Sequence, residues 1–326
     1  MFDEFKAQWT PALFSEELKA RPVGSVIAGE KVVFFRDASG APRALIDRCP
    51  HRGVSLSLGT VEAGCLRCPF HGWVFDGQGA CTSVPWNPDV NRTGLSATAM
   101  PARELGGLIW LYTAPVAQAP TEPEVPEAML LTGTSRGSTS AHWATHWTRA
   151  MENMLDSPHV PFVHRATIGN PRTGLPAMAL GGAEMVFDLV DQPWGYHVSW
   201  NAGKDKVSGA WIEWRRPNSM TLNIPAGRVY RQHVWCVPTT PGHTRMMLVS
   251  VRDFGWYINW AMGLSNWYER KILSEDQAVL ASSDPPVSPR PGQDKSVPTD
   301  KPTMVFRRWY YKNLVDGGSA EGSASG

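Results

Sequence analysis

The sequence predicts an α+β protein of two domains, and three observations support this prediction. The chain has 326 residues, of which 42% are hydrophobic, so each of two domains can bury its own core. Short strand-like runs separated by turns occupy the first third of the chain. Longer strand-like runs and then a proline-free stretch follow, which together predict an antiparallel sheet packed on a long C-terminal helix.

Residues 1–116 are expected to form a small all-β domain. The apolar runs KVVFFR (31–36) and RALIDR (43–48) flank the turn-forming segment DASGAP, as in a hairpin. A connector is expected at 117–128, because the segment TAPVAQAPTEPEVPEA carries four prolines among small and acidic residues. Such a composition favours an extended backbone without regular structure.

Residues 129–315 are expected to form the second domain. Six strand-like runs lie between residues 184 and 254, among them EMVFDLVD and VYRQHVWCVP. The proline-free stretch 255–283 ends at a Pro-Pro pair and predicts the long helix. The Gly/Ser-rich residues 316–326 are expected to be disordered.

The charge balance argues against a nucleic-acid partner. Thirty-one basic and thirty acidic residues nearly cancel, and the sequence has no lysine- or arginine-rich run. The N-terminus MFDEFKAQW lacks the apolar region of a secretory signal, and the most hydrophobic stretches are too short to cross a bilayer. We therefore expect a cytoplasmic protein that acts on a small molecule, with no membrane or nucleic-acid partner.

Two short motifs, CPH (49–51) and CPFH (68–71), each supply one thiolate and one imidazole. Two loops of this kind can hold a [2Fe–2S] cluster with two cysteines on one iron and two histidines on the other. The expected cluster ligands are Cys49, His51, Cys68 and His71. A structural zinc site is the alternative, since Cys65-x-x-Cys68 is a zinc-type knuckle that could recruit Cys49 and His51. That alternative leaves His71 without a role. In the iron–sulfur interpretation, Cys65 is expected to be a buried thiol in a strand.

A second group of candidate ligands lies at residues 151–164. His159 and His164 are too far apart for one helix face, but Pro161 between them implies a bend that could bring both rings together. A three-ligand Fe(II) site also needs a carboxylate on a third side. Asp156 is close in sequence, and Asp276 is more than a hundred residues away.

Asp276 is the preferred carboxylate because its helical neighbours are apolar. Ile272 and Leu273 precede it by one turn, and Val279 and Leu280 follow it, so its side chain is expected to be buried. A buried charge needs a partner. The adjacent Glu275 has Lys271 four residues before it, so we expect Glu275 to form a solvated ion pair and take no part in the site.

These two groups of residues resemble the metal sites of the Rieske non-haem iron oxygenases. The segments CPHRG and CPFHGW resemble the Rieske signature. The pattern Asn153-x-x-Asp156-x-x-His159-x4-His164, with a distant acid in ILSEDQAVL, is similar to the catalytic domain. The resemblance implies an N-terminal Rieske [2Fe–2S] domain and then a helix-grip, START-like catalytic domain. The short architecture is most similar to the monooxygenase and demethylase branch.

The resemblance also implies a role for each of these residues. His159, His164 and Asp276 would bind mononuclear Fe(II), and Asn153 would lie near the iron without binding it. The acid at Asp156 would link His159 to His71 of a neighbouring subunit, giving an electron path across a head-to-tail homotrimer. Electrons would come from a separate reductase or ferredoxin, because the chain has no flavin or nicotinamide fingerprint.

The expected reaction is the oxidation by O2 of a small aromatic or natural-product-like molecule, with NAD(P)H as the electron source of the reductase. Hydroxylation would give an alcohol, and oxidation of an O- or N-methyl group would release formaldehyde. Arene cis-dihydroxylation is the alternative within the family, and a zinc-stabilised ligand-binding module is the alternative of another class. The Gly/Pro-rich segment 165–182 is expected to form an irregular cover of the substrate pocket.

Overall fold

The computed structural model describes residues 1–2, 4–116, 119, 121–170, 185–202, 205–225, 227–254 and 262–317. The chain forms two compact units, Met1–Val125 and Pro126–Gly326. Parts of four predicted segments lie outside the described residues. They are positions 117, 118 and 120 of the connector, 171–182 of the pocket cover, 255–261 of the long helix and 318–326 of the tail.

The first unit is built from short antiparallel strands, as predicted, arranged in three sheets. One sheet has the order β1-β11-β10, with bounds Trp9–Phe14, Leu108–Tyr112 and Ala102–Leu105. The second has the order β2-β3-β4-β9, with bounds Val23–Ile27, Glu30–Arg36, Pro42–Ile46 and Ala99–Met100. The third has the order β5-β6-β7-β8, with bounds Thr60–Glu62, Cys65–Arg67, Val74–Phe75 and Cys81–Ser83.

The core of the first unit contains the two cysteines of the predicted cluster. Val33 and Phe35 alternate along β3 and are fully buried, and they belong to the same hydrophobic group as Cys49 and Cys68. Burial of both thiols is therefore a consequence of strand packing. The two loops that carry these cysteines are therefore anchored in the core at Cys49 and Cys68.

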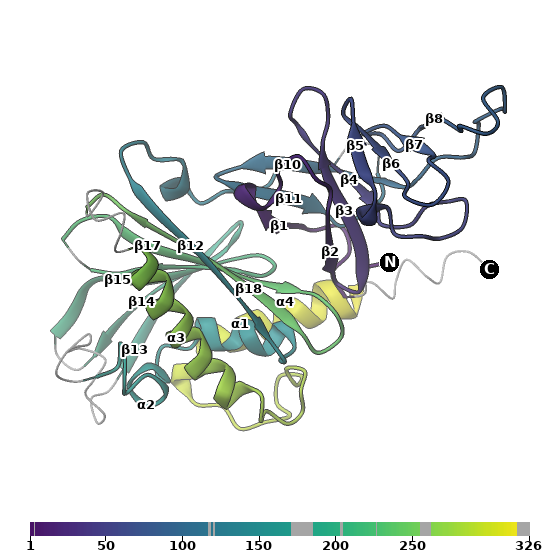
Figure 1. The fold of residues 1–326 in the computed structure, drawn as a ribbon. Coiled ribbons are helices and arrows are strands. Elements are labelled where there is room, and N and C mark those ends of the chain that lie inside the picture. The colour runs from purple at the N-terminus through teal and green to yellow at the C-terminus, as the bar shows by residue number, and fades with distance from the viewer. Residues whose placement is uncertain are drawn as a thin grey trace. The chain divides into compact units, whose positions relative to one another are not determined.

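The second unit contains one seven-stranded antiparallel sheet, which confirms the predicted α+β class (Figure 1). Its order is β12-β18-β17-β16-β15-β14-β13. The strands are β12 (Ser135–Trp143), β13 (Met185–Gln192), β14 (Gly195–Ala202), β15 (Asp205–Arg215), β16 (Ser219–Asn223), β17 (Tyr230–Pro238) and β18 (Thr244–Arg252). All six predicted runs between residues 184 and 254 are strands, and β12 precedes the helices.

Four α-helices accompany this sheet in the described residues: α1 (Trp147–Leu155), α2 (Val160–Val163), α3 (Met262–Leu280) and α4 (Lys301–Tyr310). Helix α3 packs against β12, α1 packs against β16 and β17, and α2 packs against α3 (Figure 1). The predicted long helix is α3, which ends before the Pro-Pro pair as expected. None of the described helices has the length and apolarity needed to cross a membrane.

Helix α4 is not among the predicted elements, although its sequence carries helix signals. Pro302 occupies the first turn, where a missing N–H costs nothing. Phe306 and Tyr310 are four residues apart and share one face, which packs on the ring of Trp147 at 5.9 and 5.4 Å between ring centroids. Phe306 also meets Trp214 of β15 edge to face at 5.5 Å. Helix α4 therefore packs on both α1 and β15 through aromatic side chains.

Glu152 joins α1 to α4. Its carboxylate pairs with Arg307 of α4 and, at 3.1 Å, with Arg149 one turn earlier in α1. Arg307 also pairs with Asp294 at 2.7 Å, and Arg307 is nearly buried. Since each buried charge here has an oppositely charged partner, the network fixes the position of α1, from which the loop that carries His159 continues.

We predict that His233 makes the protein lose stability in mild acid. Its side chain is 1% exposed, and burial lowers the pKa of the imidazole to about 3, with Arg231 and Arg215 acting in the same direction. The unfolded chain takes up a proton near pH 6.5, whereas the folded chain does not. Stability therefore falls as the pH drops below 6.5, by about 1.4 kcal/mol per pH unit.

The test compares urea unfolding of the wild type and His233→Gln at pH 7.5 and pH 4.5. The wild type should lose ~2 to 3 kcal/mol more unfolding free energy than the variant, because glutamine does not titrate. His243→Gln, in the exposed turn between β17 and β18, is the control and should behave as the wild type. An equal loss in His233→Gln and the wild type would contradict the prediction.

Candidate metal centres

The two loops of the first unit that carry the CPH and CPFH motifs have the same hydrogen-bond pattern. In each loop the cysteine carbonyl accepts a hydrogen bond from the amide of the glycine four residues later, at 2.8 Å from Gly53 and 3.2 Å from Gly72. Both glycines have φ = 72°, a conformation in which a side chain would be strained. The two loops are therefore matching tight turns, which place Cys49 and Cys68 in equivalent positions.

The predicted cluster ligands converge between these loops. The Nδ1 atoms of His51 and His71 face each other at 3.1 Å, and Trp73 stacks on the His51 ring at 4.6 Å. Burial, together with the neighbouring Cys68 thiol, raises the pKa of the Cys49 thiol to about 11. Two thiols in contact and two facing imidazole nitrogens are the donor set of a [2Fe–2S] cluster that is held by two cysteines and two histidines.

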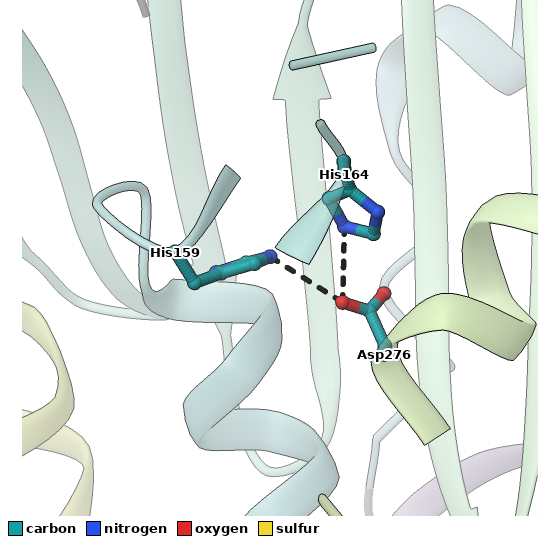
Figure 2. A group of neighbouring side chains, drawn as sticks. All are labelled: His159, His164 and Asp276. Atoms are coloured by element: carbon teal, nitrogen blue, oxygen red, sulfur yellow. Dashed lines mark ion pairs between the residues drawn. The ribbon is translucent and has the colours of Figure 1, made fainter. Parts of the chain in front are cut away.

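The second candidate centre lies where α1, α2 and α3 meet. The break after Leu155 and the proline-containing α2 place His159 just before α2 and His164 just after it. The Nε2 atoms of His159 and His164 lie 3.4 and 3.0 Å from the same oxygen, Oδ1 of Asp276 on α3. Figure 2 shows both rings directed at this carboxylate, and one ligand atom from each residue lies within 4.8 Å of the others.

The chemistry of this trio fits a divalent metal ion. Asp276 is 2% exposed, and its Oδ1 has no hydrogen-bond partner among the described residues. Burial raises the pKa of Asp276, but the His159 and His164 side chains outweigh this effect and lower it to about 2. A buried, ionised carboxylate beside two imidazole nitrogens is the 2-His-1-carboxylate set of non-haem Fe(II) sites.

The expectation that Glu275 forms a solvated pair with Lys271 is wrong. Glu275 Oε2 accepts a hydrogen bond from Nδ1 of His164 at 2.9 Å and from the Thr167 hydroxyl at 2.6 Å. Lys271 instead lies over the ring of Trp267 at 6.0 Å. A carboxylate on the far nitrogen of a metal-binding histidine fixes its tautomer and directs Nε2 at the metal. The sequence could not show this role because His164 and Glu275 are 111 residues apart.

Asp156 and Asn153 lie next to the trio. Asp156 follows the last residue of α1, and its carboxylate accepts a hydrogen bond from the backbone N–H of His159. Burial raises the pKa of Asp156. Within the described part of the chain, Nδ1 of His159 and Nδ2 of Asn153 are buried without a hydrogen-bond partner. The structure thus places the predicted residues beside the ligands, but it pairs neither Asp156 nor Asn153 with the His159 ring.

A cavity of about 110 Å³ extends from the metal ligands between the helices and the sheet. His159, His164 and Asp276 belong to its lining. Its walls are mainly apolar and come from α1, α3 and strands β14 to β18, through residues such as Met154, Ile212, Met220, Leu222, Val234, Leu248, Ile272 and Leu273. An apolar molecule in this cavity would lie against the metal position, with little water between them.

The family assignment follows from two matches. The Rieske [2Fe-2S] domain family matches residues 8–94, which include all four predicted cluster ligands. The family of the vanillate O-demethylase oxygenase C-terminal domain matches residues 143–315, more than half of the 326 residues. The chain belongs to the Rieske non-haem iron oxygenases. The first match identifies the Cys/His site of this Rieske oxygenase as an iron–sulfur site and excludes the zinc alternative. The second match includes His159, His164 and Asp276, the three iron ligands.

Curated relatives of this Rieske oxygenase carry out different reactions. Chlorophyllide a oxygenase of Chlamydomonas reinhardtii, a chloroplastic protein, is 29% identical over 313 residues, covering 92% of this chain and 47% of the relative. The oxygenase component of dicamba O-demethylase from Stenotrophomonas maltophilia is 27% identical over 295 residues, covering 83% of this chain and 86% of the relative. The chain spans about half the length of several of the curated relatives it matches.

Solved structures share the whole fold of this Rieske oxygenase. Dicamba monooxygenase bound to dicamba superimposes with a TM-score of 0.81 at 22% identity, covering 97% of this chain and 99% of that one. NdmA of Pseudomonas putida CBB5 gives a TM-score of 0.80 at 22% identity, covering 97% of this chain and 92% of the NdmA chain. At this identity the likeness establishes the fold of both units.

We predict that Glu275→Gln weakens mononuclear iron binding by about 10- to 100-fold, the usual effect of losing the carboxylate partner of a ligand histidine. Glutamine has nearly the same size but lacks the charge that favours the donor form of His164 Nδ1. Iron content is measured after dialysis against a graded series of chelator concentrations. Ser274→Ala, on the exposed side of the same helix turn, is the control. Equal iron retention in Glu275→Gln and the control would contradict this role.

Proposed function

We propose that this chain is an oxygenase component that hydroxylates or demethylates a small, largely apolar organic molecule. The observation that carries the proposal is the His159–His164–Asp276 trio in the wall of a mainly apolar cavity. An iron held by these three ligands would have coordination positions free for O2 beside the substrate. The cavity walls would hold a C–H bond of the substrate there and keep water away.

The reaction type is inferred from the relatives. One of the two matching families is named after vanillate O-demethylase, and a relative named 5,5'-dehydrodivanillate O-demethylase is 33% identical over 172 residues. These names favour removal of a methyl group from an aromatic ether. Cis-dihydroxylation is the second candidate, because a 3-chlorobenzoate-3,4-dioxygenase subunit is 36% identical over 160 residues, or 48% of this chain.

Electrons are proposed to enter through the cluster from a separate reductase or ferredoxin. Ligation by two histidines gives such clusters potentials of roughly −150 to +300 mV, so the cluster can accept an electron and pass it on. His51 and His71 are half-buried, with ring edges that a partner can approach. The cytoplasm remains the proposed location, although two relatives are named as chloroplastic.

The path from cluster to iron is proposed to cross between subunits of a head-to-tail trimer. In this arrangement Asp156 receives a hydrogen bond from His71 of the next chain on one side and from His159 on the other. The unpartnered Nδ1 of His159 supports the proposal, because a nearby carboxylate could satisfy it after a small side-chain rotation. Asp156 also borders a second, polar pocket of about 220 Å³, between α1 and the C-terminal segment.

Asp156→Asn should leave both metals bound and slow reoxidation of the reduced cluster by at least tenfold, because the amide cannot accept from both rings. Stopped-flow absorbance in a single turnover measures this rate, and iron analysis measures metal content. Asp191→Asn, at an exposed position of β13, is the control. An unchanged reoxidation rate in Asp156→Asn would remove the basis for the bridge.

Product analysis tests the reaction itself. The iron-loaded enzyme, a surrogate reductase and NADH are incubated in air with a panel of methoxyaromatics, and formaldehyde and phenols are quantified. We expect both products in equal amounts from at least one compound, and none with Asp276→Ala, which should also lose mononuclear iron. Cis-diols as the sole products would establish the second candidate instead.

A further inference from the structure

The face of α3 that borders the cavity carries a second buried acid, Glu269. Glu269, Ile272, Leu273 and Asp276 follow the spacing of one helix face. Ile272, Leu273 and Asp276 line the cavity, and Glu269 lies behind its wall. Seven helical residues rise about 10 Å. Glu269 therefore lies about two helical turns before Asp276.

The sheet presents polar side chains at the same level. Antiparallel register aligns Ile212, Leu222, Gln232 and Ser250 in one row across β15 to β18. The first three line the cavity, and Gln232 is the polar member among them. The Ser250 hydroxyl, next in the row, donates a hydrogen bond of 2.5 Å to Glu269 Oε1. The row thus changes from apolar to polar where it reaches Glu269.

The carboxyl group of Glu269 is buried and only partly satisfied. Its side chain is 3% exposed, and Oε2 has no hydrogen-bond partner among the residues described. Burial raises the pKa of Glu269, while the Ser250 hydroxyl, the Arg252 charge and the Gln232 amide favour its ionised form. An unsatisfied buried acceptor costs free energy, so its presence next to a cavity requires an explanation.

A purely structural role does not account for this arrangement. Tying α3 to β18 needs only the bond between Ser250 and Oε1. A leucine at 232 would continue the apolar wall formed by Ile212 and Leu222. An amide at the wall and a free carboxyl oxygen behind it instead provide acceptors for a polar group inside the cavity.

We propose that Gln232, in the cavity wall, and Glu269, behind that wall, form the polar end of the substrate site and accept hydrogen bonds from a hydroxyl or N–H group of the substrate. This inference rests on the proposed function, because it places that group at the end of the substrate away from the carbon that is oxidised. An engineered apolar cavity of about 150 Å³ holds benzene. The cavity of about 110 Å³ is of the same order, so a ligand with no more than one aromatic ring is expected. A carboxylate substrate brings no donor for these acceptor oxygens, so it is disfavoured.

Binding of matched probes tests the proposal without turnover. Calorimetry on the anaerobic, iron-loaded enzyme compares 4-methoxyphenol, which has a donor, with 1,4-dimethoxybenzene, which has none, and with 4-methoxybenzoate, which is an anion. We expect 4-methoxyphenol to bind at least tenfold more tightly than either of the others. Equal binding of the phenol and the diether, or preferred binding of the benzoate, would overturn the proposal.

Two variants locate the preference. Gln232→Leu should reduce the preference for the phenol over the diether to less than threefold. In Glu269→Gln the amide oxygen can keep the Ser250 bond, so the –NH2 takes the place of Oε2 and the preference should shift toward the diether. Leu222→Met, in the same row, is the control and should change binding of both probes equally. A tenfold phenol preference that persists in both variants would overturn the assignment.

Failure of this inference is distinguishable from failure of the proposed function. Formaldehyde release from methoxyaromatics without any phenol preference would leave the oxygenase function in place and exclude the polar end. A phenol preference that depends on Gln232 and Glu269 in an enzyme that oxidises none of the panel would support the polar end and exclude the proposed demethylation.

Discussion

The second unit depends on one buried carboxylate, Asp276. Removing a carboxylate from water is costly unless opposite or hydrogen-bonding groups surround it. His159 and His164 provide those groups, since both Nε2 atoms lie within 3.4 Å of the same oxygen. This requirement fixes the loop around α2 against α3 and places all three metal ligands in the cavity wall. The apolar walls then follow from the remaining residues on the same helix face.

The same separation of polar and apolar surfaces runs through the molecule. In the first unit the cysteines lie in the hydrophobic core, while the histidines remain half-buried at its edge. The cluster position therefore has a buried side, formed by the cysteines, and a partly solvent-exposed side, formed by the histidines. In the second unit the ion pairs of Glu152 with Arg149 and Arg307 hold α1 from outside the cavity, so the cavity itself needs few charges. Both metal positions are thus supported by packing that does not involve the metals.

The sequence was sufficient for the fold class and for the iron ligands, and it failed at contacts between distant segments. Asp276 could be predicted because apolar neighbours one turn away mark a buried position regardless of its partner. The role of Glu275 could not, because its nearest charged neighbour in sequence, Lys271, suggested an ordinary surface pair. Helix α4 was missed because its short apolar stripe follows an irregular, proline-rich segment. Gln232 likewise gains significance only from the register that aligns it with Ser250.

The iron site depends on the rotational position of α3, because two adjacent acids of this helix, Glu275 and Asp276, contact the same histidine. Glu275 reaches Nδ1 of His164 and Asp276 reaches Nε2 of the same ring, so the imidazole lies between two consecutive residues. Consecutive helical residues point about 100° apart, which allows this grip in only one rotational setting of the helix. Inserting or deleting one residue between Glu269 and Glu275 would turn the acids away from the ring or shift Glu269 off the cavity face. Substitutions on the outer face of α3 do not change the rotation of the helix about its axis. The residues of that face can therefore vary, whereas insertions and deletions in the helix cannot be tolerated.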